Sequence, residues 1–195
     1  NKPKTFSFAC APLVFGVLGP ELLLSFRKKY PQISLDMIEL SDSDCDAYVE
    51  ADPRHLGLLA IPENRHGERL DYIPVKTLPL YLYVHKDNPL AKQEVVNFGM
   101  LKHEAFLMLD KKSYYRKVIY SHSIPYGYRP MPAFESSDVN HICHLVNTGK
   151  GIFLATKNPA VSILFRNIVM VPFDDDTLTY SIAFTFQDYE KLEAP

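Results

Sequence analysis

The stretch FESSDVNHICHLVNTGKGIFLA, residues 134–155, contains a compact strand–helix–strand pattern. Its central part places Val139, Ile142, Cys143 and Val146 at positions i, i+3, i+4 and i+7, which predicts an amphipathic helix over 138–148. Gly149 follows directly, where a left-handed residue commonly ends a helix. The apolar run at 151–155 then predicts a buried strand.

Two histidines and a cysteine fall close together in this helix and raise the question of a metal site. Cys143 belongs to the apolar stripe, whereas His141 and His144 lie on another face of the helix. A structural metal needs about four ligands, and nothing nearby in the sequence completes such a set. We therefore expect Cys143 to pack in the core and no metal to bind.

The same alternation of apolar runs and helical periods continues along the rest of the chain. Strands are expected at 4–10, 33–40, 56–61, 72–75, 80–85, 105–109, 129–134, 151–155, 168–171 and 179–186, and helices at 13–29, 42–51, 113–121, 138–148 and 158–165. Alternating strands and helices are typical of an α/β protein with mostly parallel sheets.

Composition limits what the chain can be. Its 195 residues are 47% hydrophobic and 23% charged, with a net charge of −2, so it can bury a core in one large or two small domains. Residues 36–52 contain seven acidic residues and no Lys or Arg, and a surface of this kind repels phosphate. No apolar run approaches the roughly 20 residues of a membrane span, so no membrane partner is expected.

Three cysteines, Cys10, Cys45 and Cys143, are too few and too scattered for a disulfide framework. Reduced, buried thiols in a cytoplasmic protein are therefore expected. The first residues imitate a secretion signal, but Pro12 and Gly16 interrupt the apolar stretch and its charged start is minimal. Because the chain does not start with Met, we expect it to be part of a longer protein.

Several fragments occur in an order that resembles the effector-binding domain of LysR-type transcriptional regulators, over essentially the whole chain. They are FRKKYPQISLDMIEL (26–40), LGLLAIP (56–62), LPLYLYVHKDNPLA (78–91), PYGYRP (125–130) and the stretch quoted first. Two departures leave the ligand less defined. The strand at 56–61 has no Asp, which is frequent in the family, and Lys150 stands where an apolar residue is common.

The resemblance implies an α/β, two-lobed, periplasmic-binding-protein-like (type 2) fold with two crossover strands and a ligand cleft between the lobes. Lobe I would be 1–84 plus 176–195, and lobe II would be 85–175. It implies no cofactor, and DNA binding only through an N-terminal domain absent from this chain. It also implies a homodimer or homotetramer in which the helix at 13–29 of one subunit lies near that at 138–148 of another.

The candidate ligand-binding residues lie where strands give way to helices, since ligands gather at that edge of parallel sheets. They are Cys10, Ala11, Pro12, Leu13, Pro62, Glu63, Lys111, Ser113, Ser136, Ser137 and Thr156. Two alternatives stay open: Ser136 or Ser137 merely caps its helix, and Lys111 and Lys112 form a solvated turn. The resemblance matches Ser137 to an effector-contacting hydroxyl. The set favours a small organic-acid or aromatic effector with an apolar part and an acidic group.

The chain contains no nucleophile elbow, phosphate loop, zinc-protease motif or C-x-x-C pair. Gly149-Lys150-Gly151 follows a helix, whereas a phosphate loop precedes one. Cys10, at a helix N-terminus, would become a candidate nucleophile if its pKa were lowered and a His lay near. A buried thiol and no enzyme are expected instead. The alternative to a sensor domain is the solute-binding protein of a transporter, which uses the same fold.

Overall fold

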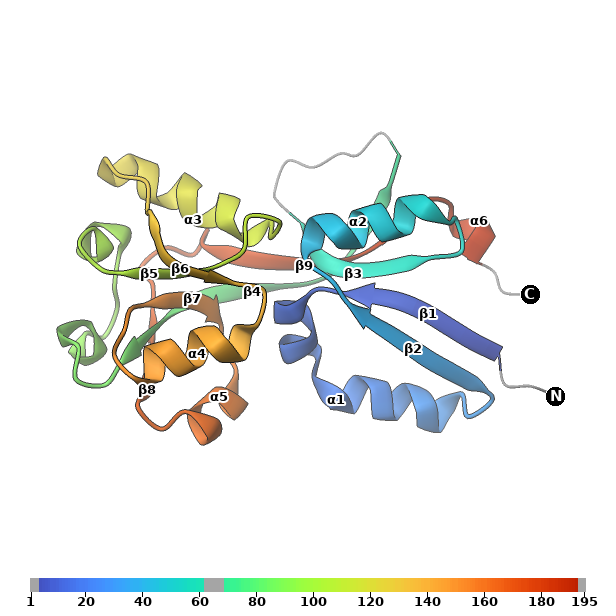
Figure 1. Ribbon diagram of the computed structural model, residues 1–195, viewed down its shortest axis with the longest axis horizontal. Helices are drawn as coiled ribbons and strands as arrows, with labels where there is room; N and C mark the ends of the chain where they lie inside the picture. The colour runs from blue at the N-terminus through green and yellow to red at the C-terminus, as the bar shows by residue number, and fades with distance from the viewer. Residues whose placement is uncertain (1–3, 62–68, 193–195) are drawn as a thin grey trace. The chain divides into compact units, whose positions relative to one another are not determined.

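The computed structural model describes residues 4–61 and 69–192 (Figure 1). The chain forms two compact units, Asn1–Lys76 with Ser181–Pro195, and Thr77–Tyr180. We call these unit 1 and unit 2. Two strands, β4 (Asp71–His85) and β9 (Thr179–Phe186), carry the chain from one unit to the other.

Unit 1 is built on a sheet with the strand order β2-β1-β3-β9. β1 (Lys4–Cys10), β2 (Ile33–Glu39) and β3 (Leu56–Ile61) are parallel, and β9 runs antiparallel to β3. The helices α1 (Pro12–Lys29) and α2 (Asp42–Ala51) lie on opposite faces of this sheet (Figure 1). The short helix α6 (Tyr189–Leu192) follows β9.

Unit 2 contains two groups of strands. β4 pairs antiparallel with β7 (Phe153–Thr156) and β8 (Ile168–Pro172), whereas β5 (Phe106–Leu109) and β6 (Pro132–Ser136) form a parallel pair. The helices are α3 (Tyr115–Ser123), α4 (Val139–Asn147) and α5 (Pro159–Leu164), with short 3-10 turns η1 (Pro89–Lys92), η2 (Phe98–Leu101) and η3 (Ile124–Tyr126). A hydrogen bond from Leu107 N to Ile152 O, 2.8 Å long, ties β5 to the start of β7.

Aromatic rings fill the centre of unit 2. Phe153 meets Tyr83 and Tyr115 edge to face, with ring centroids 5.9 and 6.1 Å apart. Both tyrosines are buried, and both hydroxyls donate to β7: Tyr83 to Thr156 O at 2.6 Å, and Tyr115 to Leu154 O. These bonds satisfy the polar ends of rings whose bodies supply the apolar contact.

Much of the expected secondary structure is confirmed, but the expectation of mostly parallel sheets is wrong. Pairings of β9, β7 and β8 are antiparallel, so the sheets are mixed. The strands expected at 72–75 and 80–85 are one strand, β4. Pro74 and Pro79 made the sequence look interrupted, yet both are exposed, and a proline is tolerated in a strand where no ladder donor is needed.

Helix α4 confirms the expected helix and the packing of Cys143 in the core. Ile142, Cys143 and Val146 are buried, and His141 and His144 are exposed. Gly149 has φ 72°, and the bonds Gly149 N to Val146 O and Lys150 N to Leu145 O, both 2.9 Å, complete a Schellman end. Within residues 4–61 and 69–192, no cluster of His, Cys, Asp or Glu has the geometry of a metal site.

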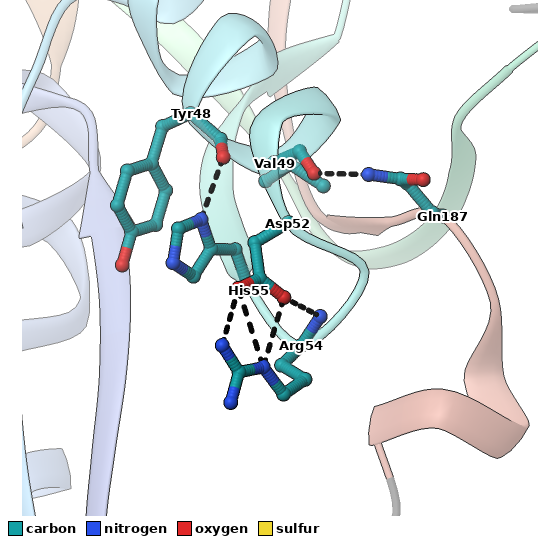
Figure 2. Close-up of polar contacts among 6 residues, drawn as sticks. All are labelled: Tyr48, Val49, Asp52, Arg54, His55 and Gln187. Atoms are coloured by element: carbon teal, nitrogen blue, oxygen red, sulfur yellow. Dashed lines mark hydrogen bonds and ion pairs between the residues drawn. The ribbon is translucent and has the colours of Figure 1, made fainter.

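Polar contacts fix the end of α2 in unit 1 (Figure 2). His55 stacks on Tyr48 at 3.9 Å between ring centroids, and its Nδ1 lies 2.7 Å from Tyr48 O. Gln187 Nε2 donates to Val49 O at 2.6 Å and so links α2 to the segment after β9. Arg54 binds both carboxylate oxygens of Asp52 and lowers the pKa of that carboxyl. The exposed pair therefore shapes the turn rather than the core.

Beneath α2, β3 and β9 approach closely. A Cβ added at Gly57 would lie 2.6 Å from Thr185 Cγ2 and 3.1 Å from Val49 Cγ2, so glycine is required there. Thr185 is fully buried, and its Oγ1 is the one buried side-chain N or O atom in the described part of the chain without a hydrogen-bond partner. An unsatisfied buried hydroxyl opposes folding.

We expect Thr185→Val to raise the free energy of unfolding by about 1 kcal/mol, because it removes the unpaired hydroxyl and keeps the shape. Thr185→Ser is the matched control, since it keeps the hydroxyl and removes the methyl group, and it should destabilise. Urea denaturation followed by circular dichroism measures both. A Thr185→Val protein less stable than wild type would show that the hydroxyl is satisfied.

Candidate functional site

In unit 1 the parallel strands β1 and β2 end together, and β3 continues to Ile61. Cys10, the last residue of β1, pairs with Glu39 of β2 on one side and Leu58 of β3 on the other. Hydrogen bonds continue past the strand end, from Ala11 N to Leu58 O at 2.9 Å and from Leu40 N to Cys10 O at 3.2 Å. Ala11 is the N-cap residue of α1, and Pro12 opens its first turn, where a missing N–H costs nothing.

The side chains of this junction are mostly buried. Cys10 and Ala11 are 1% and 2% exposed, Leu13 is also buried, and Pro12 is half-buried. Pro12 is thus the member of the expected apolar wall with side-chain surface to offer. Pro62 and Glu63, the other candidates from this unit, lie outside the described residues.

The thiol of Cys10 does not have the environment of a nucleophile. Burial, and then the nearby carboxylates of Glu39 and Asp42, raise its pKa to about 12. The helix N-terminus therefore does not lower the pKa as the catalytic alternative required. The thiols of Cys45 and Cys143 also have raised pKa values, with burial as the largest cause.

Two carboxylates near this edge differ from the expected acidic surface. Asp42 and Asp46 belong to the acidic run 36–52, yet they are 1% and 4% exposed. Asp42 Oδ1 accepts from Ala60 N at 3.0 Å, and Asp46 Oδ1 accepts from Tyr72 OH at 3.0 Å. The signal was available: Asp42, Cys45, Asp46 and Val49 follow the i, i+3, i+4, i+7 spacing of a buried stripe.

In unit 2 the register brings the candidate loops to one edge. Leu109 at the end of β5 pairs with Ser136 at the end of β6. β7 runs parallel beside β5, starting from the bridge between Phe106 and Ile152. The segments 110–113 and 136–138 and Thr156 therefore emerge at the same end of three neighbouring strands.

The start of α4 corrects the expectation for its cap. Asp138, rather than Ser136 or Ser137, is the N-cap residue, and its carboxylate accepts from Asn140 N at 2.8 Å. Ser136 Oγ accepts from Asp138 N at 3.0 Å, one step before the helix. Ser137 is exposed. An aspartate accepts as well as a serine at this position, so the run SSD left three candidates that sequence could not separate.

The residues of the turn after β5 differ in hydrogen bonding and in exposure. Asp110 accepts from Lys112 N at 2.9 Å through its side chain and from Ser113 N at 3.1 Å through its carbonyl oxygen. Lys111 and Lys112 are exposed, whereas Ser113 is buried. Thr156 is buried too, pairs with Leu80 of β4, and accepts the Tyr83 hydroxyl at its carbonyl oxygen. Thr156 thus has a structural role in the β4–β7 ladder.

The edge of unit 2 can therefore offer cations and hydrogen-bond donors to an anion. Lys111 is exposed at the β5 turn, and Lys157 follows β7 with its Nζ 5.8 Å from the Tyr81 ring centroid. The first turn of α4 adds the positive end of a helix. Carboxylates occur at both edges: Asp110 and Asp138 accept backbone N–H groups in unit 2, and Glu39 and Asp42 lie near Cys10 in unit 1.

Comparison with known proteins identifies this architecture. The family model described as LysR substrate binding domain matches residues 2–190. The chain belongs to this family. No helix within the described residues is long and apolar enough to cross a membrane.

Similar proteins agree with the assignment of this LysR substrate-binding domain. The chain is 22% identical over 176 residues to the uncharacterized HTH-type transcriptional regulator YwbI of Bacillus subtilis, covering 90% of the chain and 58% of the relative. It is 22% identical over 190 residues to the transcriptional activator protein LysR of Escherichia coli, covering 97% and 58%. The chain thus spans less than two thirds of these relatives.

Solved structures show the fold. The effector-binding domain of QuiR in complex with shikimate matches with a TM-score of 0.83 and 15% identity, covering 95% of this chain and 88% of that one. The BenM effector-binding domain with benzoate matches at 0.80 and 19%, covering 96% and 85%. The periplasmic-binding-protein-like type 2 fold expected from the sequence is confirmed.

We expect Asp138→Ala to lower the free energy of unfolding by about 1 kcal/mol, because α4 loses its N-cap acceptor. Ser137→Ala, one residue earlier and exposed, should change it by less than about 0.5 kcal/mol. Urea denaturation compares the two. A loss at Ser137 as large as that at Asp138 would contradict the capping assignment.

Cys10 should resist alkylation in the native state. With a pKa near 12 the thiolate is scarce at pH 8, and burial blocks the reagent. Iodoacetamide followed by mass spectrometry should show labelling of Cys10 only after denaturant is added, and free glutathione provides the reference rate. Native labelling as fast as that of glutathione would revive the nucleophile hypothesis.

Proposed function

We propose that this chain is the effector-sensing and self-associating domain of a LysR-type transcriptional regulator that acts in the cytoplasm. Its effector is a small organic acid, aromatic or cyclic, bound by the strand-end loops. DNA is contacted through a domain outside this chain. The observation that carries the proposal is the register of β5 and β6, which brings the loops 110–113 and 136–138 together at one edge.

The groups at this edge suit a carboxylate. Ser136 Oγ is already an acceptor for Asp138 N, which leaves its hydroxyl proton for a ligand oxygen. Lys111 supplies positive charge on an exposed turn, and the N-terminus of α4 adds its dipole. Hydrogen bonds that involve an ionised partner are about twice as strong as neutral ones.

The strand-end loop of unit 1 is apolar. The β1–α1 junction, residues 10–13, presents no polar side chain other than the protonated thiol of Cys10. The half-buried ring of Pro12 offers an apolar contact there. Shikimate and benzoate, bound by the structural neighbours QuiR and BenM, are both ring carboxylates, which supports the same class here.

Exposed apolar side chains support self-association as a homodimer or homotetramer. Leu24 of α1 is 64% exposed, Ile38 of β2 39%, and Phe134 of β6 42%. β2 is the last strand of the unit 1 sheet, so it has a free edge within that sheet. Apolar side chains at a strand edge favour contact with another chain. The relatives reported above are regulators, and nothing found favours the solute-binding alternative.

Calorimetric titration with benzoate, shikimate and related ring acids tests the proposal. At least one acid should bind, and Lys111→Ala and Ser136→Ala should each weaken that binding about tenfold, the cost of one charge-assisted hydrogen bond. Lys102→Ala, at another exposed lysine of unit 2, is the control and should change affinity less than twofold. No heat from any acid would contradict the proposed ligand class, and equal losses at Lys102 and Lys111 would contradict the site.

A further inference from the structure

Unit 1 contains an apolar cavity of about 330 Å³ between α1 and the sheet. Phe15 and Phe26 of α1 form one wall. The sheet forms the other, with contributions from β1, β2, β3 and β9 that include Phe6, Phe8, Leu35 and Phe184. Cys10, at the end of β1, is the residue that this cavity shares with the strand-end edge of unit 1.

The cavity follows from the dimensions of the two layers. Four strands about 4.8 Å apart place the outer strand axes about 14 Å from each other, whereas one helix is about 10 Å wide. α1 lies on this face and α2 on the other (Figure 1). Alternate residues of every strand nevertheless point apolar side chains at the α1 side, so the apolar face is wider than the helix that covers it.

The apolar lining of the cavity favours an apolar ligand over water or a charged molecule. Every described residue that lines the cavity is apolar or is Cys10. The Cys10 thiol is protonated, and its Sγ is 3.7 Å from Ala11 O. The backbone of β1 is paired with β2 on one side and β3 on the other, so it offers few free polar groups. A water molecule needs two to four polar partners, and a charged guest would lose its hydration without compensation.

We propose that unit 1 binds a small uncharged apolar molecule, an aromatic ring or a short acyl chain, between α1 and the sheet. This site is separate from the proposed effector site and does not depend on it. The helix and the sheet of a single unit bound the cavity on opposite sides, so a guest must be thin enough to enter between two layers. A small molecule meets that condition, and a helix of a second copy does not.

Fluorescence titration with N-phenyl-1-naphthylamine, an uncharged aromatic probe, tests the proposal. The chain has no tryptophan, so the background is low. The probe should bind saturably at one site. Leu35→Trp fills the cavity from β2 and should weaken binding at least tenfold. Ser34→Trp adds the same indole at the neighbouring exposed position, which faces away from the cavity, and should change affinity less than twofold.

A second variant and a second probe keep the test decisive. Leu35→Phe adds less bulk, so it serves if circular dichroism shows that Leu35→Trp is unfolded, and it should weaken binding about threefold. The anionic relative 8-anilinonaphthalene-1-sulfonate should bind at least tenfold more weakly than the uncharged probe. Three results would each overturn the site: no saturable binding to folded wild type, equal loss in Ser34→Trp, or probe binding lost on self-association in size-exclusion runs.

Discussion

The alignment of strand ends is the constraint on which the candidate site depends. Cys10 stands beside Glu39 at the ends of β1 and β2, and Leu109 stands beside Ser136 at the ends of β5 and β6, so the loops that leave each pair of strands start from a common edge. A slip of one residue would turn every side chain of a strand to the opposite face. The alternating burial of β2, where Ile33, Leu35 and Met37 are half-buried and the residues between them are exposed, opposes such a slip.

The strand-end edges of the two units differ in the side chains that they carry. In unit 1, Cys10, Ala11 and Leu13 are drawn into the core, and the nearby carboxylates Asp42 and Asp46 are buried and hydrogen-bonded. In unit 2 the turn exposes Lys111, and Ser136 keeps a hydroxyl proton to donate. The proposed acid recognition therefore rests on the second unit alone.

Local patterns predicted most elements because their signals are local. The i, i+3, i+4, i+7 stripe of α4 and the αL glycine at its end follow from residues within a few positions of one another. The direction of β9 and the continuity of β4 do not, since they depend on pairing with distant strands. The sequence was sufficient to predict which residues follow the strands and so lie at the strand-end edge of a sheet. Whether a side chain there turns outward, as at Ser137, or inward, as at Leu13, depends on packing that periodicity alone does not give.

The size of the side chains on each face of the unit 1 sheet explains why an apolar cavity forms beside α1. The strands of unit 1 alternate correctly for a two-layer core, with Phe6 and Phe8 on one face and the Gly57 contact with Val49 on the other. On the α2 side the sheet carries Gly57, and the side chain of Val49 from α2 packs directly against it. On the α1 side the inward positions carry large rings, including Phe6, Phe8 and Phe184. Residue size at alternate positions thus differs between the two faces of the sheet, and the cavity lies on the face that carries the large rings.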